Sequence, residues 1–119
     1  MREIVKAFKA LSDETRLRML NLLMERECCV CEVMQVLEIS QARASRNLSA
    51  LYDAGFLKLR HDGLWSLYSI DREGSKQFCA DLDKAVGKAL EGSEIALRDR
   101  RRLRNAERIG PGCTSRVPA

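Results

Sequence analysis

Residues 31–55, CEVMQVLEISQARASRNLSALYDAG, contain two segments with helical periodicity that are separated by a polar break. Ser40 at that break is a good cap for the second segment, and Gly55 stands where the end of that segment is expected. The apolar residues of the second segment that we expect to face inward are Ala44, Leu48, Leu51 and Tyr52. Two short helices joined by a turn of about four residues have the spacing of a helix-turn-helix.

The periodicity changes directly after Gly55. Residues 56–60 and 64–70 are rich in Leu, Trp, Tyr and Ile, which favours strands, and they flank Asp62-Gly63, a strong signal for a hairpin turn. A helix-turn-helix that is followed by a β-hairpin is a winged helix. The sequence therefore predicts a mainly α fold with a small β-hairpin, a winged helix-turn-helix.

Helices are also predicted on both sides of this motif, at residues 2–10, 13–26 and 75–90. The first and the last carry apolar faces for which a small winged domain has little core left. We therefore expect a homodimer through the N- and C-terminal helices, rather than packing within one domain alone. Residues 1–104 are expected to form the winged-helix DNA-binding and dimerisation domain. Residues 105–119 lack periodicity and contain Gly-Pro-Gly, which predicts a flexible C-terminal tail.

Length, charge and composition restrict the class of protein. The 119 residues suffice for one domain, and five Arg and one Asp in residues 98–104 account for the whole net charge of +4. We interpret that run as a solvated helix end. No segment resembles a signal peptide or a membrane span, so we expect a cytoplasmic protein without membrane contact. A nucleophile–base constellation, a Gly-rich phosphate loop and an acid pair are all missing, so we expect neither an enzyme nor a catalytic cofactor.

The second helix of the motif is the candidate recognition helix for double-stranded operator DNA. Its outward side chains are neutral or basic, with no acidic residue before Asp53, and Arg, Asn and Gln can pair with the edges of bases. The hairpin adds basic side chains for a neighbouring phosphate or groove. The predicted DNA-binding residues are Ser40, Gln41, Arg43, Ser45, Arg46, Asn47, Lys58, Arg60 and His61.

Three cysteines gather in residues 26–32, RECCVCE. Cys29 falls at the expected N-cap of the helix that follows, with Glu32 placed as in a capping box, and Cys31 lies in the first turn. A helix N-terminus lowers the pKa of a thiol, so these sulfurs are predicted to be ligands for a soft metal. Residues i and i+2 of a regular helix do not face each other. Joint ligation therefore requires that the first turn unwinds or lies half outside the helix, and we expect binding to distort this helix and to affect DNA binding.

The chain resembles the ArsR/SmtB family of metalloregulatory repressors over about residues 3–90. The resemblance rests on the LSDETRLRMLNLL helix, the CVCE sequence, the recognition segment SQARASRNLSALYDAGFL and the pattern of Gly, Trp, Tyr and Ile in the wing. It implies a homodimeric winged-helix repressor that leaves its operator when a metal or metalloid binds. In the arsenic-responsive branch the ligands would be Cys29 and Cys31, and the inducer As(III) or Sb(III).

The third ligand of that branch would fall on Met34, whose thioether cannot serve as a thiolate. We expect Cys28 to replace it, with Cys113 on the tail as the alternative, and we expect Cys79 to be structural. Residues 73–104 contain no His, so the histidine sites of the zinc-sensing branch are missing, as are the N-terminal cysteines of the cadmium/lead branch.

Other interpretations of the cysteines remain open. They could form a thiol-redox switch on the same fold, with a disulfide within residues 28–31 or to Cys113. They could also respond to Cd or Pb, hold a closed structural zinc site, or be small buried hydrophobic residues.

Overall fold

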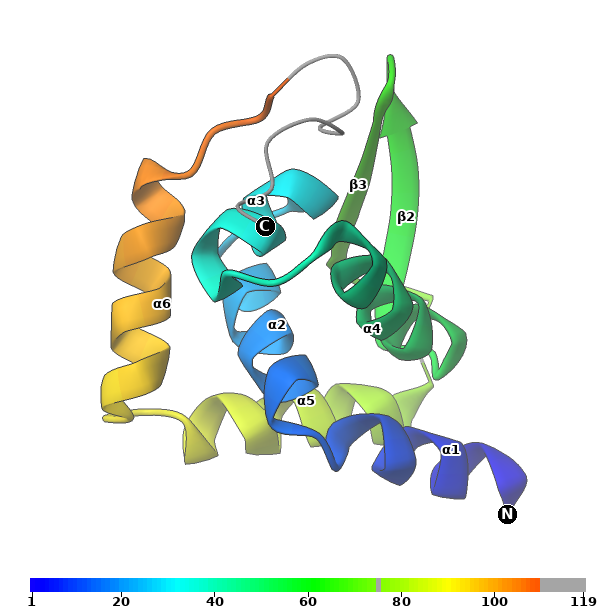
Figure 1. Cartoon of the computed structure of the whole chain (residues 1–119). Coiled ribbons are helices and arrows are strands. Elements are labelled where there is room, and N and C mark those ends of the chain that lie inside the picture. The colour runs from blue at the N-terminus through cyan, green and yellow to red at the C-terminus, as the bar shows by residue number, and fades with distance from the viewer. Residues whose placement is uncertain (75, 110–119) are drawn as a thin grey trace.

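The structure is a computed structural model that describes residues 1–74 and 76–109 (Figure 1). In chain order the described residues form α1 (Arg2–Leu11), α2 (Glu14–Glu25), β1 (Cys28–Cys29), α3 (Val30–Leu37), α4 (Gln41–Asp53), β2 (Leu57–Asp62), β3 (Trp65–Ile70), α5 (Gln77–Ala89) and α6 (Glu94–Asn105). Helices α3 and α4 are the helix-turn-helix, and β2 and β3 are the hairpin that follows it. The winged helix-turn-helix that the sequence predicts is confirmed.

Short polar side chains cap several helices at their N-termini. Ser40 accepts a hydrogen bond from the backbone N–H of Arg43 at 3.2 Å and so begins α4, as predicted. Glu38 ends α3 in the left-handed conformation, with a φ of 56°, and the chain then turns into α4. These two local features set the geometry of the helix-turn-helix.

The wing contains a strand that the sequence did not reveal. The sheet has the order β1-β3-β2, and all neighbours are antiparallel. Cys28 pairs with Tyr68 and Cys29 pairs with Leu67. The hairpin turn has Gly63 at a φ of +61° as its first central residue, as in a type II′ turn. Cys28 and Cys29 are therefore part of the same sheet as the wing.

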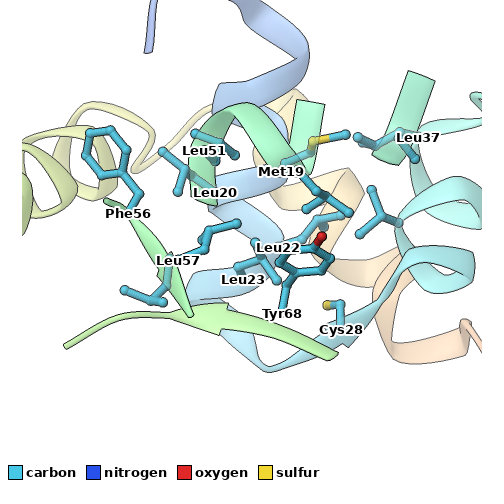
Figure 2. Packing of buried hydrophobic residues seen from close by; sticks show 14 of the residues in the cluster. Met19, Leu20, Leu22, Leu23, Cys28, Leu37, Leu51, Phe56, Leu57 and Tyr68 are labelled. Carbon is cyan, nitrogen blue, oxygen red and sulfur yellow. The ribbon is translucent and has the colours of Figure 1, made fainter. Parts of the chain in front are cut away.

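One hydrophobic core joins the helix-turn-helix to the wing. Figure 2 shows it between α2, α3, α4 and the sheet, with Phe56, Leu57 and Tyr68 facing leucines of the helices. Three of the four residues of α4 that we expected inside are fully buried, but Tyr52 is 46% exposed, and the expectation for it was wrong. The helical spacing places Tyr52 at the margin of the buried face of α4.

Helix α6 packs against α2 and α3. Four of the five Arg in its basic run are exposed, as the sequence predicts, but the helix itself is part of the folded domain. Asp99 is fully buried and accepts hydrogen bonds from the guanidinium of Arg18 at 2.8 and 3.0 Å. Arg102 donates to the backbone oxygen of Val36 at 3.1 Å and to the carboxylate of Glu38 at 2.7 Å. Because the carbonyl groups at the end of a helix lack partners within it, Arg102 stabilises the C-terminus of α3.

An apolar face remains exposed on α1. Ile4, Val5 and Phe8 are 40%, 43% and 55% exposed, which agrees with the apolar face that the sequence leaves without a core. Among the described residues, no helix is both long enough and apolar enough to cross a bilayer.

Candidate metal site and nucleic-acid interface

The sulfur atoms of Cys29 and Cys31 lie together at the start of α3. Cys29 is the N-cap and has extended backbone angles, φ −87° and ψ 168°, so it lies half outside the helix. The two Sγ atoms are 2.7 Å apart. From the sequence we expected that joint ligation requires the first turn of α3 either to unwind or to lie half outside the helix. The structure shows the second arrangement, so α3 does not have to unwind for both sulfurs to reach one ion.

Glu32 fixes the backbone at this pair. Its carboxylate accepts a hydrogen bond from the N–H of Cys29 at 2.9 Å and ion pairs with Arg26 at 2.6 Å and Arg108 at 3.1 Å. Burial would raise the pKa of Glu32, but the bonds from Cys29, Arg26 and Arg108 outweigh burial and hold that pKa below its usual range. The capping box predicted from Cys29 and Glu32 is present.

Burial, not the helix N-terminus, decides the pKa values of the thiols. It raises the pKa of Cys29 to about 11 and the pKa of Cys28 to about 12. The prediction that the helix N-terminus lowers the pKa was therefore wrong for Cys29, because loss of hydration outweighs the hydrogen bonds at the helix start. A ligand that binds Cys29 must consequently react with a thiol that is protonated at neutral pH.

The structure does not bring Cys28 to this pair. Successive residues of a strand point to opposite faces, and Cys28 packs in the main core beside Tyr68 (Figure 2). Its Sγ donates to the backbone oxygen of Arg26 at 3.3 Å. Cys29 and Cys31 instead form a separate small cluster with Leu67 and Trp65. The geometry therefore does not support our expectation that Cys28 is the third ligand, because its sulfur lies in a different cluster from those of Cys29 and Cys31.

The other sulfur atoms lie elsewhere or beyond the described residues. Met34 is buried in the main core, and the Sγ of Cys79 on α5 donates to the backbone oxygen of Ala54 at 3.6 Å. Within residues 1–74 and 76–109, no group of three or more His, Cys, Asp or Glu side chains is arranged to hold a metal ion. Cys113 lies outside the described residues. The described part of the site is thus a pair of sulfurs.

On the candidate recognition helix, the side chains differ in what they can offer to DNA. Gln41, Arg43 and Arg46 are exposed on α4, and Ser45 is half-buried. The side chain of Asn47 is used within the protein, because its Oδ1 accepts from Arg16 at 2.9 Å and its Nδ2 donates to the backbone oxygen of Arg43 at 2.9 Å. Asn47 therefore positions α4 against α2, which sequence periodicity could not reveal.

Two of the three wing residues that the sequence points to also have partners within the chain. Arg60 donates to both carboxylate oxygens of Glu27 at 2.8 and 2.6 Å, and the Nδ1 of His61 lies 3.3 Å from the hydroxyl of Ser66. Lys58 is exposed. Arg60 links the wing to the residue that directly precedes the cysteines.

The sequence is similar to those of known bacterial regulatory proteins. Residues 13–58 match the family described as bacterial regulatory protein, arsR family. The chain is 43% identical to a cadmium resistance transcriptional regulatory protein CadC homolog of Staphylococcus aureus, over 63% of each chain. It is 34% identical to an arsenical resistance operon repressor of Bacillus subtilis, over 61% of this chain and 70% of that one.

A solved structure shows the same fold. The homodimeric winged helix-turn-helix DNA-binding domain Mb0332 of Mycobacterium bovis, described as a possible ArsR-family regulator, aligns over 78% of this chain and 82% of that one. The TM-score is 0.64 and the identity is 26%. The fold is that of the winged helix-turn-helix proteins, a class that includes this DNA-binding domain. Within that class the chain belongs to the ArsR family.

We expect Arg46→Ala to weaken binding to operator DNA by about 1–3 kcal/mol, because Arg46 is exposed on the recognition helix and can pair with a guanine. The melting temperature should not change. Fluorescence anisotropy measures the affinity, with a duplex that the metal-free protein has selected from a random-sequence library. Arg101→Ala, an exposed position on α6, is the matched control. Equal affinities of Arg46→Ala and the wild type would contradict the assignment of α4 as the recognition helix.

Proposed function

We propose that this protein is a repressor that binds operator DNA as a homodimer and is released when As(III) or Sb(III) binds to Cys29 and Cys31. The observation that supports this proposal most is the pair of Sγ atoms 2.7 Å apart at the start of α3. This pair lies in a member of the ArsR family, next to both DNA-binding elements. Its relative from Bacillus subtilis is named an arsenical resistance operon repressor.

The surroundings of the pair favour a soft, neutral ligand. Cys29 and Cys31 are only 1% and 4% exposed, and their neighbours in the small cluster are the apolar side chains of Leu67 and Trp65. Sulfur is a soft donor, and a hard cation such as Mg²⁺ would need several oxygen ligands in place of these sulfurs. Arsenous acid is uncharged, and it exchanges its hydroxyl groups for thiols, so it enters this apolar site without a large cost of burying charge.

We further propose Cys113 as the third sulfur ligand. Cys28 faces the main core, Cys79 is bonded to the backbone of Ala54, and Met34 carries a thioether. The chain at residues 107–109 contacts the surroundings of the pair, and Cys113 follows Ile109 by four positions in the sequence. Four residues span up to about 14 Å, which suffices to reach the pair from this chain.

The dimer is proposed from the exposed apolar face of α1 and from the homodimeric relative of known structure. A two-fold dimer places its two recognition helices in successive major grooves. We therefore expect a nearly palindromic operator whose half-sites lie about 34 Å apart.

A thiol-redox switch is the second candidate, and the same short distance favours it. Two sulfurs 2.7 Å apart need little movement to reach the length of a disulfide bond, about 2.05 Å. Hydrogen peroxide would oxidise the two thiols to a disulfide and would itself be reduced to two water molecules. Operator release by peroxide, with none by arsenite, would select this function.

Single Cys→Ser variants test the metalloid site. We expect Cys29→Ser and Cys31→Ser to lose the ultraviolet sulfur-to-arsenic absorbance and the release of DNA by arsenite, because each removes one of the two paired sulfurs. Cys113→Ser should weaken arsenite binding at least about tenfold, through loss of one of three bonds to sulfur. Absorbance titration and fluorescence anisotropy with the selected duplex measure these effects.

Cys28→Ser and Cys79→Ser are the matched controls, since both thiols lie in the main core. They should lower the melting temperature but leave the stoichiometry of arsenite binding unchanged. Full arsenite binding and release in Cys29→Ser or Cys31→Ser would contradict the proposed site. Loss of binding in Cys28→Ser, with retention in Cys113→Ser, would contradict the proposed third ligand.

Proton release distinguishes a metalloid from a divalent cation. Because burial raises the pKa of Cys29 to about 11, its thiol is protonated at neutral pH. Arsenous acid and three thiols give an arsenic trithiolate and three water molecules, with no net proton. Cd²⁺ instead releases one proton for each thiol, so its affinity should rise up to about tenfold per pH unit for each proton released. The arsenite affinity should be nearly constant between pH 6.5 and pH 8.

Calorimetry in two buffers of different ionisation enthalpy measures the protons released by each ion. An arsenite affinity that rises with pH as steeply as that of Cd²⁺ would contradict the exchange of hydroxyl groups for thiols at this site.

A further inference from the structure

The chain that follows α6 returns to the cysteine pair. We call residues 106–109 the strap; Figure 1 shows it running from the end of α6 past α3 toward the hairpin. The backbone of Glu107 forms two hydrogen bonds with the side chain of Gln35: Nε2 of Gln35 donates at 2.6 Å, and Oε1 accepts at 3.1 Å. The backbone oxygen of Glu107 also lies 3.8 Å from the Sγ of Cys31. The strap therefore lies directly against one of the two sulfurs.

A charged contact holds the strap at the start of α3. The Nε of Arg108 donates to the carboxylate of Glu32 at 3.1 Å, and the side chain of Glu32 is only 3% exposed. The same carboxylate oxygen accepts the N–H of Cys29. Because a hydrogen bond to a buried ionised group is stronger than one between neutral groups, Arg108 is the main anchor of the strap.

Trp65 connects the strap to the wing. It is the first residue of β3, and its indole Nε1 donates to the backbone oxygen of Ile109 at 3.3 Å. The side chain of Trp65 also packs against the cluster of Cys29, Cys31 and Leu67. One side chain of the wing thus contacts both the sulfur cluster and the strap.

Binding of one ion by both sulfurs must change these contacts. Two sulfurs that share one centre at about 2.3 Å, with bond angles of about 100°, lie roughly 3.5 Å apart. The present Sγ–Sγ distance is 2.7 Å, so the side chains must separate on binding. The neighbours of the two sulfurs include the backbone oxygen of Glu107, which lies next to Cys31, and the side chains of Leu67 and Trp65.

We propose that the strap and Trp65 report the occupancy of the cysteine pair to the wing. Binding moves Cys31 against Glu107 and displaces the strap, so the indole of Trp65 loses the oxygen of Ile109 and the wing changes its position. This inference rests on the proposed function, and it adds a route for the signal that does not pass through the recognition helix. Gln35, Arg108 and Trp65 are positioning residues in it and are not ligands.

The test uses full-length protein with Gln35→Leu and Arg108→Gln combined, and Arg101→Gln as the matched control. Trp65 is the only Trp, so its emission reports on the strap. Absorbance measures arsenite binding. The affinity for the selected duplex without arsenite, divided by the affinity with arsenite, measures the coupling between arsenite binding and DNA binding; we call it the affinity ratio. In the wild type and the control, arsenite should change the emission in step with the absorbance. In the double variant, arsenite should bind with unchanged stoichiometry, while the affinity ratio falls at least about tenfold.

Trp65→Phe is a second variant that keeps the apolar packing and removes the N–H donor. It should keep the arsenite stoichiometry of the wild type but lower the affinity ratio. An affinity ratio equal to that of the wild type in both the double variant and Trp65→Phe, with arsenite bound, would overturn the role of the strap. Failure of the wild type to bind arsenite at all would overturn the proposed function, and this inference with it.

Discussion

The cysteine site depends on the hydrogen bond and the two ion pairs that the buried carboxylate of Glu32 forms. This carboxylate joins the N–H of Cys29, the end of α2 through Arg26, and the chain beyond α6 through Arg108. A buried charge is costly unless it is paired. The three partners of Glu32 therefore hold Cys29 half outside the helix, where its sulfur meets that of Cys31. The close pair follows from this arrangement and needs no distortion of α3.

The cysteine pair also lies next to both of the elements that we propose to bind DNA. The pair lies where strand β1 becomes helix α3, so one side of it belongs to the wing sheet and the other to the helix-turn-helix. From the sequence we expected the signal to pass through α3 to the recognition helix. The structure offers a shorter route, since Cys29 pairs with Leu67 on β3 and Arg60 on β2 is bound to Glu27. The strap adds a third connection between the pair and the wing.

Much of the fold could be predicted from the sequence, because helical periodicity, the cap at Ser40 and the hairpin signal are local features. The capping box of Cys29 and Glu32 was also predictable from spacing alone. Strand β1 was not, because two residues show no periodicity and their pairing partners lie about 40 positions away. The opposite directions of the sulfurs of Cys28 and Cys29 follow from that strand. The raised pKa of Cys29 follows from burial, and the use of Asn47 by Arg16 follows from helix packing, both of which depend on the tertiary structure.

We propose that Cys29 and Cys31 together bind the inducer through sulfur. X-ray absorption at the arsenic edge measures the atoms around arsenic, on full-length protein loaded with one equivalent of arsenite per chain. We expect an arsenic atom surrounded by three sulfur atoms and no oxygen in the wild type, and a loss of sulfur neighbours in Cys29→Ser and Cys31→Ser. An arsenic atom that keeps its oxygen neighbours in the wild type, or its full set of sulfur neighbours in those two variants, would show that Cys29 and Cys31 do not bind arsenic together.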